Sequence, residues 1–176
     1  KGKVYSIKGY MVPEGQRTAR GRAIVNLLQL SENEKVRAMI PLKANTEGYI
    51  MMATQKGLIK KTALSEFASI RKTGKIAISI VEGDELISVQ LSSGNDQVII
   101  ASHEGKCIRF SEDDVRAMGR DTQGVRSITL NEDDIVVDMA VIKEGCEVIT
   151  MTENGYGKRS DIEDYRMQTR GGKGVK

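Results

Sequence analysis

A glycine-marked pattern repeats about every 50 residues along this chain of 176 residues, and no other feature constrains its fold as strongly. Four segments of the sequence begin with this pattern. They read KGKVYSIK from residue 1, KGLIKKTA from 56, EGKCIRFS from 104 and NGYGKRSD from 154. Downstream of the last three, a second glycine stands in a basic setting at Gly74, Gly124 and Gly174, each 50 residues after the one before. We therefore predict a single repeat domain over 1–176, with units 1–55, 56–103, 104–153 and a partial unit 154–176.

Within a unit the residues follow the pattern of short β-strands joined by tight turns. Residues 75–80 alternate with a period of two, which predicts a strand with Ile76, Ile78 and Ile80 on one face. Other short apolar or alternating runs predict strands at 36–42, 49–54, 58–62, 86–91, 97–102, 107–110 and 125–130. Short helical turns are expected only near 63–67, 112–118 and 161–165.

About four strands in each 50-residue unit are typical of propeller blades, and a repeated β-sandwich is the alternative architecture. We predict an all-β, β-propeller-like fold with blades of about four antiparallel strands. Propellers close with about 4–8 blades, and this chain holds fewer units than that, so we expect an incomplete ring.

The composition excludes several classes of protein. Hydrophobic residues make up 39% and charged residues 29%, which indicates a soluble globular chain without a membrane span or signal peptide. Because it opens at Lys1 rather than at methionine, we expect a piece of a longer protein. Cys107 and Cys146 stand in different apolar runs and are interpreted as reduced core thiols, and His103 as a residue of an exposed turn. A metal site and catalysis by a Ser/His or Cys/His pair are therefore not expected.

Positive charge returns at equivalent places of the repeat. Residues 1–30 and 56–80 each hold six basic residues and one acidic residue, and residues 155–176 hold six and three. Residues 104–130 hold five of each, whereas the intervening segments are neutral or acidic. On a rigid curved body such a repeat suits a polyanion that bends around it, such as duplex DNA. Simple solvation of strand edges is the competing interpretation, and the few aromatic residues argue against single-strand binding.

We predict phosphate contacts, with little base specificity, from basic residues of every unit. The candidates are Arg17, Arg20, Arg22, Lys60, Lys61, Arg71, Lys72, Lys75, Arg109, Arg116, Arg120, Arg126, Lys158, Arg159, Arg170 and Lys173. The last two belong to the heptad QTRGGKG, which lacks the spacing of a phosphate-binding P-loop. Since its final glycine belongs to the 50-residue series, we interpret the heptad as a repeated turn with a secondary DNA contact.

Several stretches of this chain resemble one known family over nearly its whole length. RGRAIVNLLQLSENEKV, GLIKKTALSEF, VRAMGRDTQGVRSI and NGYGKRSDIEDYRMQTRGGKGV look like the C-terminal, DNA-wrapping domain of the A subunit of bacterial DNA gyrase. The related domain of topoisomerase IV, which serves in substrate selection, and a protein-interaction propeller are the alternatives. The resemblance implies a β-pinwheel, a propeller variant in which neighbouring blades exchange strands.

The same resemblance implies a non-catalytic module of a type II topoisomerase in the bacterial cytoplasm, associated with the nucleoid and with no membrane contact. Duplex DNA would wrap around its basic rim, and the holoenzyme, a heterotetramer of gyrase A and B subunits, would supercoil it negatively. ATP and Mg²⁺ are used elsewhere in that holoenzyme, and strand cleavage occurs in another domain, so this chain itself needs no cofactor.

The family's wrapping box reads Q-R-R-G-G-K-G, and the heptad at the end of this chain resembles it with Thr169 in place of an arginine. The family's box precedes the GRAIVNLL stretch, whereas this heptad follows it. The heptad is therefore expected to be a later-blade relative of the box. Its matching positions are Gln168, Arg170, Gly171, Gly172, Lys173 and Gly174.

Overall fold

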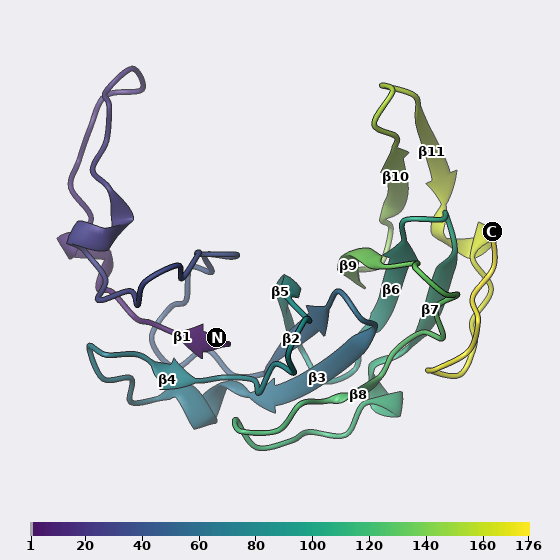
Figure 1. Cartoon of the computed structure of the whole chain (residues 1–176), viewed down its shortest axis with the longest axis horizontal. Coiled ribbons are helices and arrows are strands. Elements are labelled where there is room, and N and C mark those ends of the chain that lie inside the picture. The colour runs from purple at the N-terminus through teal and green to yellow at the C-terminus, as the bar shows by residue number, and fades with distance from the viewer. Residues whose placement is uncertain (1) are drawn as a thin grey trace.

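Glycine turns close the hairpins of the computed structural model, which describes residues 2–176 (Figure 1). Gly57 turns the first hairpin with a φ of 82°, a left-handed conformation that favours glycine, and Gly105 and Gly155 repeat it. The hairpin strands are β2 (Tyr49–Thr54), β3 (Leu58–Ala63), β6 (Gln97–Ser102), β7 (Cys107–Ser111), β10 (Glu147–Met151) and β11 (Gly157–Asp161). The glycine that opens each of these three repeats is therefore a hairpin turn.

Each blade combines strands from successive repeats. The remaining strands are β1 (Lys3–Val4), β4 (Lys75–Ile76), β5 (Leu86–Ser92), β8 (Val125–Arg126) and β9 (Val136–Ile142). The central antiparallel sheet has the order β5-β2-β3-β8. The next sheet has the order β9-β6-β7, and an isolated bridge between Cys107 and Val175 takes the place that β8 has in the central sheet. Strand β1 pairs with β4, and β10 with β11.

The sheets follow one another along an open arc (Figure 1). Strands β5 and β9 lie toward its concave side, whereas β4 and β8 lie on the convex side. Within residues 2–176 the sheets do not close into a ring. The predicted all-β, propeller-like fold with an incomplete ring is confirmed.

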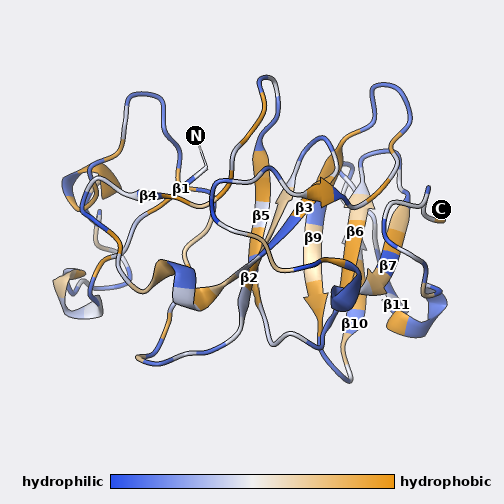
Figure 2. Cartoon of the chain, turned by 90° about the horizontal axis from the view of Figure 1, so that it is seen from below, coloured by the Kyte–Doolittle hydropathy of each residue, from blue (hydrophilic) through white to orange (hydrophobic). Residues whose placement is uncertain are grey.

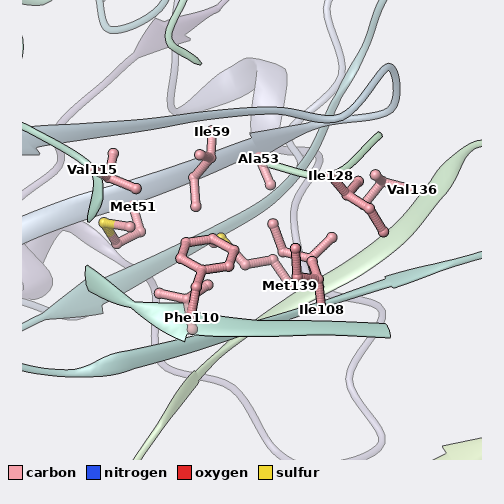
Figure 3. Close-up of a cluster of buried hydrophobic side chains, with 11 residues drawn as sticks. Met51, Ala53, Ile59, Ile108, Phe110, Val115, Ile128, Val136 and Met139 are labelled. Atoms are coloured by element: carbon pink, nitrogen blue, oxygen red, sulfur yellow. The ribbon is translucent and has the colours of Figure 1, made fainter. Parts of the chain in front are cut away.

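Apolar side chains between neighbouring blades form the core. One cluster joins Met51 and Ile59 of the first hairpin to Ile108 and Phe110 of the second, all fully buried (Figure 3). A second cluster packs Phe67 and Ile78 against the other face of the first hairpin. In Figure 2 the strands β5 and β6 are coloured as hydrophobic, whereas loops at their ends are largely hydrophilic. Burial of apolar area thus holds successive blades together.

The predicted strand at 36–42 is wrong, because the structure has no strand there. Met39 is 83% exposed and Leu42 50%. The equivalent segments, β5 and β9, pair with the first strand of the preceding hairpin, β2 and β6. Within residues 2–176, no strand lies beside residues 36–42. Without a neighbouring strand, the backbone N–H and C=O groups of this apolar run make no ladder hydrogen bonds and are solvated by water instead.

The predicted strand at 75–80 is too long. Only Lys75–Ile76 is a strand, since the N–H groups of Ala77 and Ile78 both donate to the carbonyl of Gly2. Ile76 is 47% exposed while Ile78 is fully buried, so the isoleucines do not share one face. Likewise only Val125–Arg126 of the predicted strand at 125–130 is formed.

Short helical turns lie where they were predicted. They are the 3₁₀ turns η3 (Leu64–Phe67), η4 (Glu112–Asp114) and η5 (Ile162–Asp164), with two more, η1 (Gly9–Met11) and η2 (Ile24–Asn26), near the N-terminus. His103 stands in an exposed turn, as expected, and Cys107 is a buried free thiol. Cys146 is exposed, which corrects its interpretation as a core residue, because it lies in the turn between β9 and β10.

Candidate nucleic-acid interface

Three equivalent segments, 68–76, 116–126 and 166–175, form what we call the outer edge of the arc. Each ends in a short strand or bridge on the second strand of a preceding hairpin, or, for 68–76, on β1. This places them on the opposite side of the blade from the inner strands β5 and β9. In Figure 1 they follow the convex side, from β4 through β8 to the C-terminus.

The repeated glycines hold these segments close to the neighbouring blade. Gly124 has a φ of 101°, and a Cβ there would lie 2.5 Å from the carbonyl oxygen of Ile59. Gly174 has a φ of 72°, and its Cβ would lie 2.6 Å from the carbonyl oxygen of Cys107. A side chain at either position meets both a strained backbone and a steric clash. Glycine is therefore required here by close packing against the neighbouring hairpin rather than by the predicted turn.

Most of the predicted cations are accessible, but they occupy three regions. On the outer edge Lys75, Arg120 and Arg170 are partly exposed, and the exposed ones are Arg71, Lys72, Arg116, Arg126 and Lys173. Arg17, Arg20 and Arg22 are exposed in the N-terminal segment between η1 and η2. Lys158 and Arg159 are exposed on β11 at the other end of the arc. Of these three regions, only the outer edge carries accessible predicted cations from three successive repeats.

The structure brings three outer-edge cations together around a shared cavity. Arg71, Lys75 and Arg120 line a cavity of about 390 Å³ between two successive repeats. Glu66 stands beside it, with Oε2 3.5 Å from Nε of Arg120. Sequence reasoning missed Glu66, although it is the one acidic residue within 56–80.

The box-like heptad is built into the contact between blades. Arg170 donates from Nε to the carbonyl of Asp114 at 3.0 Å and from Nη1 to the carbonyl of Arg126 at 2.6 Å. The backbone N–H groups of Gln168 and Gly171 donate to the carbonyls of Arg109 and Ser127. Thr129 closes the contact by donating to the carbonyls of Gly171 and Gly172. Of the two heptad cations, Lys173 is exposed, whereas the Arg170 guanidinium holds the blade contact.

Lys60 is not available for a phosphate, which corrects its prediction as a DNA contact. Its side chain is fully buried, and Nζ donates to the carbonyls of Ala77 at 2.7 Å, Thr122 at 3.1 Å and Arg120. Burial lowers the pKa of Lys60 from 10.5 to about 8. The ammonium group thus clamps the outer-edge turn of one repeat onto the preceding repeat.

Lys61 and Arg109 are corrected in the same way, because they occupy one buried position in successive hairpins. Lys61 is 6% exposed; its Nζ lies 3.4 Å from Oε1 of Glu112 and 4.9 Å from the centre of the Tyr49 ring. Arg109 is 5% exposed and donates to Glu163 Oε1 at 2.9 Å and to backbone carbonyls of η5 and its C-cap. Both cations fasten a hairpin to the next 3₁₀ turn, so neither faces solvent.

Acidic side chains of the repeat cap turns rather than bind metal. Asp134 accepts from the N–H groups of Glu104 and Ile135, and Asp84 makes the same pair of bonds with Lys56 and Glu85. Burial raises the pKa of the Asp134 carboxyl, but these hydrogen bonds outweigh it and hold the pKa below 3.8. Residues 2–176 contain no cluster of three His, Cys, Asp or Glu side chains able to hold a metal ion.

In the first repeat the equivalent acid is Glu34, which accepts from the N–H of Ser31 and the hydroxyl of Tyr5. Burial and this hydrogen bond raise the pKa of Tyr5 to about 12. The 50-residue spacing of Glu34, Asp84 and Asp134 is therefore a structural signal. In the described part of the chain, no helix is long and apolar enough to cross a membrane.

Comparison with known proteins identifies a family. A family model described as "DNA gyrase C-terminal domain, beta-propeller" matches residues 1–43, 48–93, 96–143 and 147–176. The chain is 49% identical over 176 residues to the DNA gyrase A subunit of Escherichia coli K12, covering 99% of this chain and 20% of that protein. For the same protein of Staphylococcus epidermidis the identity is 45% over 180 residues, covering 100% and 20%. The chain thus spans about a fifth of these relatives.

Solved structures agree with this assignment. The structure of a DNA gyrase A C-terminal domain superposes with a TM-score of 0.84 at 29% identity, covering 99% of this chain and 56% of that one. The C-terminal domain of a DNA topoisomerase IV gives a TM-score of 0.81 at 26% identity, covering 88% and 49%. The family model and the gyrase A relatives together place the chain in the DNA gyrase C-terminal domain family.

Proposed function

Since this chain belongs to the DNA gyrase C-terminal domain family, we propose that its outer edge binds and bends duplex DNA through the phosphate backbone. Within a gyrase, this part wraps DNA for the rest of the A subunit and for the B subunit, which together supercoil it at the expense of ATP. The chain contributes no catalytic group to that reaction, and it acts in the bacterial cytoplasm at the nucleoid.

One observation carries this proposal: accessible cations recur on the convex side of a curved array. Arg71 and Lys72 stand on the first outer-edge segment, Arg116 and Arg126 on the second, and Lys173 on the third. A polyanion that follows the arc meets each segment in turn. Neutralising phosphates with Lys and Arg releases counterions, which gives affinity without base recognition.

The proposal includes fewer DNA-contacting residues than the sequence predicted. Lys60, Lys61 and Arg109 are left out because their charged groups serve inside the fold. Arg17, Arg20, Arg22, Lys158 and Arg159 stay in the proposal as flanking contacts, since they are exposed at the two ends of the array. The remaining outer-edge cations form the central part of the path.

A protein-interaction surface is the competing function. The N-terminal segment exposes Tyr10 and Met39 by 87% and 83%. Its apolar run at 36–42 is equivalent to inner strands that pack in the other repeats, so a missing strand partner accounts for part of that exposure. Tyr10 and Met39 both lie outside the outer-edge segments, so the two functions can be tested with separate substitutions.

A salt titration tests the proposal. Affinity for short duplexes of unrelated sequence should be similar, and log K should fall with log salt by about 0.9 for every phosphate contacted. Changing Lys143, an exposed cation in the turn after β9, should have little effect, whereas removing Arg71 with Arg126 should weaken binding about tenfold or more. Absence of duplex binding by the unmodified protein at low salt would contradict the proposal.

A topology assay tests wrapping. Relaxed circular plasmid is incubated with the protein and a relaxing topoisomerase, and the topoisomers are then separated. Stabilised positive writhe indicates wrapping, while an unchanged distribution together with duplex binding would reduce the function to binding alone.

A further inference from the structure

The cavity between Arg71, Lys75 and Arg120 is assembled from two repeats. Arg71 and Lys75 come from the segment 68–76, whereas Arg120 comes from the equivalent segment of the next repeat. Ser69 and Gly74 complete its lining. Three cations around one cavity of about 390 Å³ suit a single anionic group with several oxygens. We call this site the inter-repeat pocket.

The backbone that carries Arg120 is fixed. Nζ of Lys60 donates to the carbonyls of Arg120 and Thr122, and the hydroxyl of Ser79 donates to the carbonyl of Asp121 at 2.8 Å. The N–H of Ser79 adds a fourth bond, to the carbonyl of Thr122. The guanidinium itself has only long contacts, with Nη1 3.5 Å from the carbonyl oxygen of Ile76 and Nε 3.5 Å from Glu66 Oε2. The pocket is therefore preorganised at the level of the backbone.

Glu66 partly neutralises the pocket. Its Oε2 lies 3.5 Å from Nε of Arg120, and that Nε makes no hydrogen bond within residues 2–176. The two side chains are 49% and 32% exposed. An ion pair this exposed contributes little to stability, and another anion can replace the carboxylate at small cost. Lys75 Nζ donates to the Glu66 carbonyl rather than to its side chain.

The pocket has no equivalent in the next repeat. Fifty residues on, Arg71 and Lys75 are replaced by Asp121 and Val125, and the counterpart of Arg120 is Arg170, whose guanidinium donates to two backbone carbonyls. The equivalent place between the third and fourth repeats therefore lacks this group of three cations.

We propose that the inter-repeat pocket seats one phosphodiester group of bound DNA, and that Glu66 is an internal carboxylate that this phosphate displaces from Arg120. The proposal rests on the duplex-binding function proposed above and names the position at which that binding is anchored. It assigns Glu66 a regulatory role: the carboxylate lowers affinity and is released when DNA arrives.

The experiment uses the complete gyrase A subunit that carries this chain, assembled with the B subunit. It measures the affinity for duplex DNA as a function of salt concentration. Glu66→Gln should tighten binding about two- to fivefold, which corresponds to the strength of an exposed ion pair. Arg71→Gln combined with Arg120→Gln should weaken binding and reduce the salt slope by roughly one contact. Lys143→Gln and Glu82→Gln are the charge-matched controls, since both residues are exposed outside the outer edge.

A double-mutant cycle separates displacement from general electrostatics. If Glu66 acts through Arg120, Glu66→Gln should give no gain in an Arg120→Gln background. An equal gain in both backgrounds, or an equal gain from Glu82→Gln, would overturn the role of Glu66. Because misfolding cannot tighten binding, the gain stays interpretable.

The remaining outcomes distinguish the two proposals. If the unmodified protein binds duplex DNA while the Arg71/Arg120 double variant behaves like the Lys143→Gln control, the pocket is wrong and the general function stands. If the unmodified protein does not bind at low salt, the general function fails as well.

Discussion

Lys60 offers the sharpest test of how the repeats are joined. In Lys60→Met, a side chain of similar length stays between the blades, and the carbonyls of Ala77, Arg120 and Thr122 lose their common donor. Three hydrogen bonds from a charged donor contribute about 1.5–3 kcal/mol each. Against this, the fall in pKa from 10.5 to about 8 means that burying the charge costs about 3 kcal/mol at neutral pH. We expect Lys60→Met to lower the free energy of unfolding by roughly 1.5–6 kcal/mol at pH 7.

The cost of this substitution should depend on pH. Because the pKa of Lys60 is lower in the folded protein, the unfolded chain binds more protons between about pH 8 and 10.5, and the stability of the unmodified protein rises across that window. By pH 10 the gain is about 2–3 kcal/mol, and it is lost again as the pH falls from 10.5 back to 8. Lys60→Met lacks the titrating group, so the gap between the two proteins should widen by that amount at alkaline pH.

Urea unfolding of both proteins at pH 7, 8, 9 and 10 measures this gap, because the other titrating groups are shared and cancel in the difference. The reasoning requires a difference that grows with pH. A difference that stays constant with pH would show that the three carbonyls stabilise the ammonium enough to cancel the free-energy cost of burying it. A difference near zero at every pH would refute the clamp itself.

Three other substitutions test the joints between blades. Gly124→Ala should cost about 2–4 kcal/mol in urea unfolding, whereas Gly145→Ala, with a φ of 75° but nothing within 4 Å of the new Cβ, should cost about 1. Asp134→Asn should lower the melting temperature at pH 6, and this loss should shrink as the pH falls below 3.8, because the depressed pKa of Asp134 gives stability that is lost as the carboxyl protonates. Arg109→Met should cost about 3–5 kcal/mol and Arg159→Met less than about 1, and similar losses would contradict the assigned burial.

The repeat, the hairpin turns and the 3₁₀ turns could be predicted from the sequence because each depends on a short local pattern. Gly57 and Gly124 adopt positive φ values, and such positions favour glycine whatever surrounds them. Strand length could not be predicted in the same way. Strand β4 ends at Ile76 because Gly2, more than seventy residues earlier, accepts from the next two N–H groups. A period of two in the sequence carries no information about such a distant partner.

The sequence predicted that the candidate site follows one surface of the repeat array, but it did not predict which cations of each repeat are accessible. Positive charge recurs in the repeat, and its exposed members follow the convex edge. Lys60 and Lys61 read as part of the same basic run, yet both are buried, since their neighbours in the fold are backbone carbonyls and Glu112. Composition counts every lysine as a surface charge, whereas a long side chain can place its ammonium inside a joint.

Arg109 and Arg159 show why the role of a residue in such an array depends on the following repeat. They stand 50 residues apart, at the same place on β7 and β11. Arg109 is buried because η5 of the next repeat packs over it, while Arg159 is 69% exposed and reaches only Glu147 on its own hairpin. Within residues 2–176, the same position thus supplies a structural clamp in one repeat and an exposed ion pair in the next. The proposed DNA contacts are therefore the cations that packing between blades leaves accessible, rather than every cation in the sequence.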